Sequence, residues 1–273
     1  MEYLTAIWQS IILGTVQGLT EFLPVSSSGH LALLHRILGA DFGGNTLFFD
    51  IMLHVGTLIA VVAVLWRDIL DLFKKPFKTL LILIVATIPA GVVGLLFNGW
   101  IEDVTNGPYG VVILSCCFAV TAVLLLVAEH IAKKRQEAQP FGWKHGICMG
   151  LMQAVALFPG ISRSGSTIAA GVLSGAERKS VAHFSFLMSI PVILGSALVS
   201  GIDVVKQPEI VTSIGGSGFV GIAVGVVFAA VSGFFAVKFM LRVIEKANYK
   251  WFSLYLALLA VTCLSLYAAG VIV

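Results

Sequence analysis

Long runs of apolar residues alternate along this chain with short polar connections. Six runs are long enough to cross a hydrocarbon core, which takes about 17 to 25 helical residues: 49–66, 79–97, 109–128, 183–202, 217–241 and 252–272. Two further apolar regions, 4–38 and 145–174, each contain a polar interruption. The pattern therefore predicts six transmembrane helices and two interrupted helical segments.

The composition places these helices in a membrane. Of the 273 residues, 58% are hydrophobic and only 11% are charged, and the mean hydropathy is +1.00. A soluble domain carries roughly 25% charged residues, so a water-exposed surface cannot be built from this chain. We expect an all-α polytopic membrane protein with membrane lipid around it and no nucleic-acid partner.

Basic residues are concentrated in alternate connections, which sets the orientation. They follow the first, third and fifth spans: Arg67, Lys74, Lys75 and Lys78; Lys133, Lys134, Arg135 and Lys144; Arg242, Lys246 and Lys250. The other two connections are poor in basic residues and carry Glu102 and Asp103, or Asp203, Lys206 and Glu209. By the positive-inside rule, the three basic connections are cytoplasmic.

The same rule predicts two re-entrant hairpins. Arg178 and Lys179 precede the span at 183–202, so they should lie on the same side as the basic connection at 129–144. The apolar segment 145–174 runs between these two cytoplasmic points and must leave and return on one side. By the same reasoning, residues 1–38 form a hairpin that enters from the outside.

The chain then divides into two repeats of one hairpin and three spans. The first repeat is 1–128, a cytoplasmic linker follows at 129–144, and the second repeat is 145–273. Because three is odd, the second repeat is inverted in the membrane. Inverted repeats with broken helices near the midplane are a known membrane architecture.

An offset of 136 residues supports the repeat independently. It places residues 14–29 on 150–165, and six of the sixteen positions are identical. The offset was chosen to maximise this match, so the match adds to the charge pattern and does not replace it. The six pairs are Gly14/Gly150, Gln17/Gln153, Phe22/Phe158, Ser26/Ser162, Ser28/Ser164 and Gly29/Gly165.

The two polar interruptions read "TEFLPVSSSGH" (20–30) and "FPGISRSGST" (158–167). Pro24 and Pro159 each remove a backbone donor and disfavour helix in the preceding residue. The serines that follow are good N-caps, so a new helix should begin within each interruption. Two helix N-termini facing the protein centre would form an anion site, and Arg163 adds a planar cationic fork suited to phosphate.

Glycines recur four residues apart at matching places in the two hairpins. These are Gly14 and Gly18 in the first and Gly146 and Gly150 in the second. Small residues at this spacing allow close helix packing, although glycine is also generally common in membrane helices.

Glu21 and Arg163 are the strongest candidates for chemistry. An ionised side chain at the bilayer centre costs at least ~2.5 kcal/mol and usually marks an ion or substrate path. Gln17 shares a helical face with Glu21 because it lies four residues earlier. Ser27 coincides with Arg163 at the 136-residue offset; it is either a cap or a nucleophile.

For three further polar residues, the sequence is consistent with either a structural or a chemical role. His30 could act as acid, base or phosphate ligand, or hold a tertiary hydrogen bond in a polar pocket. Asp50 and His54 lie four apart at the outer end of a span. They either hold that helix end or belong to the site.

On these motifs, the chain resembles the undecaprenyl pyrophosphate phosphatase family, the bacterial bacitracin-resistance proteins. The first family signature, an acidic or amide residue and a Glu four positions later, matches "QGLTE" (17–21) running on into "FLPVSSSGH". The second, Pro-Gly-x-Ser-Arg-Ser-x-x-Thr, is complete at 159–167, and "FDIMLHVGTLIAV" (49–61) also fits. Gln17 stands where many members have Glu, which weakens the case for a charged metal ligand there.

The resemblance implies hydrolysis of undecaprenyl pyrophosphate to undecaprenyl phosphate and phosphate, in the bacterial cytoplasmic membrane. It implies a divalent cation, Mg²⁺ or Ca²⁺, and an active site open to the extracytoplasmic side. It also implies resistance to bacitracin, which sequesters the substrate; a homodimer is left open.

On the same basis we expect Glu21, with Gln17, to hold the metal or Glu21 to act as base, and Arg163 to neutralise phosphoryl charge. Ser27 would be the nucleophile with His30 assisting proton transfer, and water is the alternative nucleophile. The substrate-binding residues that we expect are the hydroxyl side chains of both motifs: Ser26, Ser28, Ser162, Ser164 and Thr167.

Two other functional classes share part of this pattern. A secondary transporter or a flippase of the phosphorylated carrier would also use inverted repeats around broken helices. A type-2 phosphatidic acid phosphatase is suggested by "SSSGH", but no histidine follows Arg163 within ten residues and the Lys-x6-Arg-Pro element is absent. That class is set aside.

Overall fold

The computed structural model describes residues 2–40, 46–135, 137–206, 209–212, 214–244 and 248–271. Lys246 of the third basic connection and residue 272, the last of the predicted final span, lie outside the described residues. The described chain forms eleven helices: α1 (Glu2–Phe22), α2 (Ser27–Leu38), α3 (Thr46–Leu72), α4 (Lys78–Asn106), α5 (Gly110–Lys134), α6 (Trp143–Val155), α7 (Arg163–Ser174), α8 (Arg178–Lys206), α9 (Glu209–Thr212), α10 (Gly215–Val243) and α11 (Lys250–Ala268).

The predicted all-α membrane class is confirmed. Six of the described helices are long and apolar enough to cross a membrane, namely α3, α4, α5, α8, α10 and α11. All six run past the predicted apolar segments at one or both ends, because the helical hydrogen-bond ladder continues into polar flanks that hydropathy leaves out. At its other end α11 stops at Ala268, before the predicted 272, where the backbone turns through Gly270 at a positive φ of 69°.

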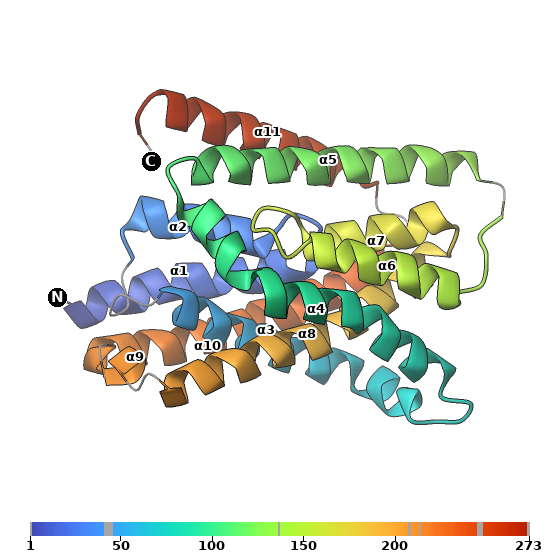
Figure 1. Cartoon of the computed structure of the whole chain (residues 1–273), viewed down its shortest axis with the longest axis horizontal. Coiled ribbons are helices and arrows are strands. Elements are labelled where there is room, and N and C mark those ends of the chain that lie inside the picture. The colour runs from blue at the N-terminus through green and yellow to red at the C-terminus, as the bar shows by residue number, and fades with distance from the viewer. Residues whose placement is uncertain are drawn as a thin grey trace.

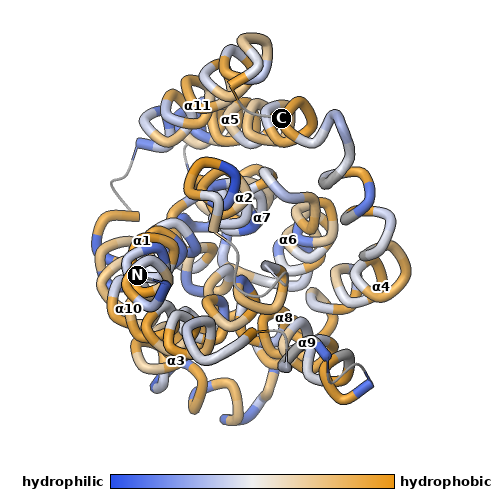
Figure 2. The backbone as a smooth tube through the Cα atoms, turned by 90° about the vertical axis from the view of Figure 1, so that its left-hand side faces the viewer, coloured by the Kyte–Doolittle hydropathy of each residue, from blue (hydrophilic) through white to orange (hydrophobic). Residues whose placement is uncertain are grey.

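The distribution of polar and apolar side chains is reversed relative to a soluble protein. Large apolar side chains such as Leu95 and Leu198 are 76% and 68% exposed on the outer surface. Polar side chains such as Gln17 and Ser166 are fully buried. Figure 2 shows the hydrophobic colouring spread over the outer helices, with α2 and α7 near the middle of the bundle. Lipid is the solvent that suits this outer surface.

Two helical hairpins enter the bundle from opposite ends. Figure 1 shows α1 and α2 reaching in from the end where both termini lie, and α6 and α7 from the other. Their turns meet: Ser164 Oγ, at the start of α7, donates to the Leu23 carbonyl after α1 at 2.8 Å. The α3–α4, α5–α6 and α7–α8 connections share the second end (Figure 1), and basic residues lie within the first two and directly after the third, at Arg178 and Lys179.

The helix bounds repeat at the offset found in the sequence. α7 begins at Arg163, 136 positions after the first residue of α2 at Ser27, and both helices have 12 residues. α1 packs on α10, and α6 packs on α4, which occupies the corresponding place in the first half. The inverted repeat stays a prediction. An inverted repeat would produce matching helix pairs of this kind in the two halves.

The glycine pairs permit the closest helix contacts, as their spacing predicted. A Cβ added to Gly18 would lie 2.6 Å from the Gly233 backbone nitrogen of α10. A Cβ added to Gly150 would lie 2.8 Å from the Ala86 Cα of α4. Backbone atoms cannot yield as side chains can, so the packing prediction is confirmed at both hairpins.

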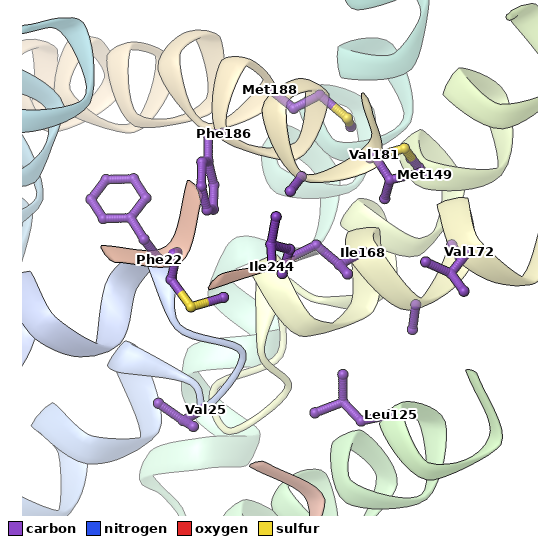
Figure 3. Close-up of a cluster of buried hydrophobic side chains, with 14 of the residues drawn as sticks. Phe22, Val25, Leu125, Met149, Ile168, Val172, Val181, Phe186, Met188 and Ile244 are labelled. Carbon is purple, nitrogen blue, oxygen red and sulfur yellow. The ribbon is translucent and has the colours of Figure 1, made fainter. Parts of the chain in front are cut away.

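An apolar cluster holds the turns of the hairpins in place. Phe22 and Val25 from the first hairpin pack near Ile168 of α7 and Phe186 of α8 (Figure 3). The rings of Phe22 and Phe186 meet edge to face with centroids 5.5 Å apart. Since Phe22 and Val25 adjoin Glu21 and Ser26 in the chain, this packing fixes the backbone from which the polar residues project.

Candidate active site

Glu21 lies in the last turn of α1, 5% exposed, and its carboxylate gathers polar groups from four segments. Its Oε2 accepts from Gln17 Nε2 at 2.9 Å and from Ser27 Oγ at 2.5 Å. The same oxygen lies 3.5 Å from His54 Nε2 of α3. Its other oxygen accepts from Arg163 at the start of α7. The donors from Gln17, Ser27 and Arg163 lower the cost of a buried negative charge at Glu21.

The first interruption forms a strained turn and a helix N-terminus. Ser26 has φ 68° and ψ 91°, a backbone conformation that costs of order 1–3 kcal/mol for a residue with a side chain. Its side chain caps α2 by accepting from the Gly29 amide at 3.3 Å. The turn places Ser27 at the first position of α2, with its hydroxyl on Glu21. Strain held at a functional turn is a common form of preorganisation.

The second interruption forms a second N-terminus without that strain. Ser162, at φ −68°, caps α7 by accepting from the Gly165 amide at 3.0 Å. Its own amide donates to Thr121 Oγ1 of α5 at 3.1 Å. The positive φ that this turn needs falls on Gly160, at 94°, where it costs little. The N-termini of α2 and α7 therefore converge on Glu21 and Arg163, as the sequence predicted.

A cavity of about 180 Å³ opens among these groups. Its polar wall contains nine residues: Glu21, Ser26, Ser27, Ser28, His54, Ser162, Arg163, Ser164 and Ser196. Its apolar wall includes Ile51 of α3, Leu157 of the second turn and Val192 of α8. A site with one charged wall and one apolar wall suits a ligand that has a polar head and a hydrocarbon tail.

His30 and Thr167 do not line this cavity. His30 Nδ1 lies 2.7 Å from the Ser26 carbonyl and its Nε2 lies 2.6 Å from the Tyr255 hydroxyl of α11. Its ring also stacks on Tyr255, with planes 7° apart. Thr167 Oγ1 bonds to Ser185 Oγ at 2.7 Å and to carbonyls of its own helix. Both residues therefore lie outside the cavity wall: His30 contacts the strained Ser26 turn, and Thr167 joins α7 to α8.

Asp50 and His54, whose roles the sequence left open, make different contacts. Asp50 accepts from His35 Nε2 at 2.8 Å and so links α3 to α2. His54 donates from Nδ1 to the Asp50 carbonyl at 2.7 Å, which turns Nε2 toward Glu21. His54 thus lines the cavity and Asp50 does not. The sequence does not indicate Thr121, because a threonine within an apolar span carries no local signal of the Ser162 amide that it binds at the start of α7.

Two buried polar atoms next to Glu21, one on Arg163 of the cavity wall and one on Gln17, which does not line the cavity, have no hydrogen-bond partner among the residues that the structure describes. They have opposite character. Arg163 Nη1 is a donor and Gln17 Oε1 is an acceptor. An unsatisfied buried group costs about 1–3 kcal/mol. The donor suits a phosphate oxygen, and the acceptor suits a cation or a water held by one.

The donor set fits a divalent cation that is shared with a ligand. Among the residues that the structure describes, no group of three His, Cys, Asp or Glu side chains could hold a metal alone. Mg²⁺ is commonly bound by one or two carboxylates together with phosphate oxygens and water. The Glu21 carboxylate, together with the unpartnered amide oxygen of Gln17, could supply the protein ligands for such a shared cation.

Known proteins are similar in sequence to this chain over nearly its whole length. Residues 10–262 match the family described as Bacitracin resistance protein BacA. An undecaprenyl-diphosphatase of Carboxydothermus hydrogenoformans is 41% identical over 266 residues, which cover 96% of this chain and 98% of that protein. One of Halothermothrix orenii is 39% identical over 252 residues, covering 91% and 93%. One of Bacteroides fragilis is 38% identical over 262 residues, covering 93% and 96%.

The match begins within α1 and ends within α11, and it includes both polar interruptions and every residue that lines the cavity. The chain belongs to the bacitracin resistance protein BacA family.

Proposed function

We propose that this protein hydrolyses undecaprenyl pyrophosphate to undecaprenyl phosphate and inorganic phosphate. The observation that carries the proposal is the Ser27–Glu21–Arg163 contact set, in a cavity with one charged and one apolar wall. The charged wall receives the pyrophosphate and the apolar wall the first part of the prenyl chain. Renewed supply of the carrier for cell-wall synthesis accounts for resistance to bacitracin, which sequesters the substrate.

Ser27 is the proposed nucleophile. Its hydroxyl donates to Glu21 Oε2 at 2.5 Å, the nucleophile–base contact that activates a serine. The oxygen attacks the terminal phosphorus, its proton passes to Glu21, and the bond to the bridging oxygen breaks to release undecaprenyl phosphate. Water then hydrolyses the phosphoserine and releases phosphate.

Arg163 and the two helix N-termini stabilise the charge that moves during this transfer. The unpartnered Nη1 of Arg163 is available to a phosphoryl oxygen while Nη2 holds Glu21. Backbone amides in the first turns of α2 and α7 supply further donors. Preorganised donors of this kind need no rearrangement as charge develops on the phosphoryl oxygens.

A divalent cation, Mg²⁺ or Ca²⁺, is proposed at Glu21 and Gln17. When bound, it would neutralise pyrophosphate charge as a Lewis acid. Ser26, Ser28, Ser162 and Ser164 lie at the two N-termini and are proposed to bind phosphate oxygens. His30 is proposed to position the Ser26 turn.

The cavity is proposed to face the extracytoplasmic side of the bacterial cytoplasmic membrane. Ile51 and His54 lie in the first half of α3, and Val192, Ile193 and Ser196 lie in the second half of α8. Both halves are toward the end of the molecule opposite the basic connections, which the positive-inside rule places in the cytoplasm. This supports substrate entry from outside.

Phosphate release from the purified protein in detergent separates hydrolysis from transport. A flippase needs a sealed membrane and a phosphatase does not, so release that depends on cation and on Ser27 supports hydrolysis. Quenching the reaction in acid with terminally ³²P-labelled substrate should trap label on the protein, and Ser27→Ala should abolish it. Turnover without label on wild-type protein would assign the attack to water, and absence of turnover in detergent would favour transport.

A further inference from the structure

Tyr255 of α11 is joined to the turn before α2 through the His30 ring. The Tyr255 hydroxyl lies 2.6 Å from His30 Nε2, and the two rings stack with their centroids 5.7 Å apart. The other ring nitrogen, Nδ1, lies 2.7 Å from the Ser26 carbonyl oxygen. A side chain of the last helix therefore reaches, through one imidazole, the strained residue that precedes Ser27.

The direction of both hydrogen bonds follows from the chemistry of the groups. The Ser26 carbonyl can only accept, so Nδ1 of His30 carries a proton. The ring contacts a carbonyl, a hydroxyl and the rings of Tyr255 and Phe118, which are uncharged groups that favour a neutral imidazole. In a neutral ring Nε2 is then an acceptor, and the Tyr255 hydroxyl donates to it. Because the bond at one ring nitrogen sets which nitrogen holds the proton, this hydroxyl favours the Nδ1–H tautomer of His30.

His30 donates twice to the Ser26 carbonyl oxygen. The backbone amide of His30 donates to it at 3.2 Å, in addition to the imidazole contact. A carbonyl oxygen has two lone pairs, so its direction is fixed from two sides, and with it the plane of the peptide that leads to Ser27. At φ 68°, Ser26 has a conformation that persists only where its surroundings over-determine it. The imidazole bond is therefore a restraint on the turn that sets Ser27 on Glu21.

Both partners of the contact between Tyr255 and His30 are anchored on α5. Ser253, two residues before Tyr255, donates to the Ala122 carbonyl at 2.7 Å, and α11 packs along α5 (Figure 1). On the other side, the His30 ring meets Phe118 edge to face with centroids 6.0 Å apart. Phe118 and Ala122 are about one helical turn apart. One helix therefore holds the hydroxyl and the imidazole at a fixed separation.

We propose that Tyr255 is a positioning residue, whose hydroxyl selects the His30 tautomer that restrains the Ser26 turn. The inference rests on the proposed hydrolysis, in which this turn holds Ser27 on Glu21 as nucleophile and base. Tyr255 lies outside the cavity wall and acts only through His30. Without its hydroxyl the imidazole proton is free to move to Nε2, and the ring then no longer donates to Ser26. A relaxed turn lowers kcat more than it changes KM, because the charged groups that bind the pyrophosphate stay in place.

The kinetic test compares wild-type protein with Tyr255→Phe, which keeps the stacked ring and removes only the hydroxyl. Tyr255 is exposed at the outer surface, so the substitution leaves the core intact. Tyr267→Phe is the matched control, because it removes the hydroxyl that donates to the Pro108 carbonyl at 3.3 Å, about three turns further along the same helix. We expect Tyr255→Phe to lower kcat about three- to tenfold, as loss of one neutral hydrogen bond does. KM should stay within about twofold, and the control should keep both values.

Nuclear magnetic resonance of protein labelled with ¹⁵N-histidine reads the tautomer itself and does not depend on hydrolysis. The chain has six histidines, and His30→Asn identifies the His30 signals by their loss. Wild-type protein should carry the His30 proton on Nδ1, and Tyr255→Phe should move it toward Nε2. The same tautomer in both proteins would overturn the proposal, and so would a changed tautomer with unchanged kcat. An equal loss of kcat in Tyr267→Phe would also overturn it, since α11 would then act as a whole.

A double variant tests whether Tyr255 acts through His30. The amide nitrogen of His30→Asn can still donate to the Ser26 carbonyl, but this side chain has no second ring nitrogen for Tyr255 to hold. Adding Tyr255→Phe to His30→Asn should therefore cause no further loss of kcat or, where His30→Asn has no turnover, of Tm. A further loss as large as in the wild-type background would overturn the proposal. Absence of turnover in wild-type protein would instead count against the proposed hydrolysis, and the tautomer comparison would still decide the link between Tyr255 and His30.

Discussion

Arg163 and Glu21 are 142 positions apart in the chain and form an ion pair between the turns of the two hairpins. Each side chain is mostly buried, with 15% and 4% of the side chain exposed. A buried pair is costly to break by removing one partner, because the other charge is left uncompensated. The pair therefore joins the two halves of the molecule at the point where we place the chemistry.

Replacing Glu21 by Gln should nearly abolish pyrophosphate hydrolysis. Glutamine keeps the shape and can still accept a hydrogen bond from Ser27, but it has neither basicity nor charge for a cation. Steady-state phosphate release at saturating cation measures the loss, and thermal unfolding in detergent checks the fold. Near wild-type turnover would reduce Glu21 to a structural partner of Arg163.

Replacing Arg163 by Lys should lower turnover at least about tenfold. Lysine keeps the positive charge but cannot hold Glu21 with one nitrogen and offer a second to phosphate. Loss of one donor that acts on developing charge typically costs about 10² to 10³ in rate. kcat and KM should be measured separately, because this interaction acts mainly on kcat. Unchanged kcat and KM would mean that Arg163 serves only to join the hairpins.

Replacing Gly18 by Ala should destabilise the protein by about 1–3 kcal/mol or more, as overpacking does. The added Cβ would meet backbone atoms of Ala229 and Gly233 in α10, which cannot move without shifting the helix. Gly91→Ala in α4 is the control, since a Cβ there has no neighbour within 4 Å. Unfolding midpoints of the two variants give the comparison, and equal midpoints would rule out the close contact.

Cysteine labelling should place the ends of the molecule on opposite sides of the membrane. In a background without the four native cysteines, Tyr109→Cys should react with an impermeant reagent added to intact cells. Lys74→Cys should react only after the membrane is opened. Both positions are exposed, so protection reports the side and not burial. Reactivity of Lys74→Cys from outside would reverse the proposed orientation.

Local patterns in the sequence determined the fold class and the six spans. Hydropathy over about 20 residues sets which segments enter lipid, and Pro24 and Pro159 mark where a helix must stop. The charge of the connections predicted two hairpins from opposite sides. The glycines at 14, 18, 146 and 150 marked the close helix contacts correctly. All of these are properties of contiguous segments, so no knowledge of tertiary contacts was needed.

Only the tertiary structure decided which side chains share the cavity. His30 and His54 are equally polar in the sequence, yet α11 supplies a partner that holds His30 away while α3 turns His54 onto Glu21. The strain at Ser26 and the cap from Thr121 likewise arise from elements brought together by packing. Such relationships depend on distances between residues that are remote in the chain. A pattern of residue types along the sequence carries no information about those distances.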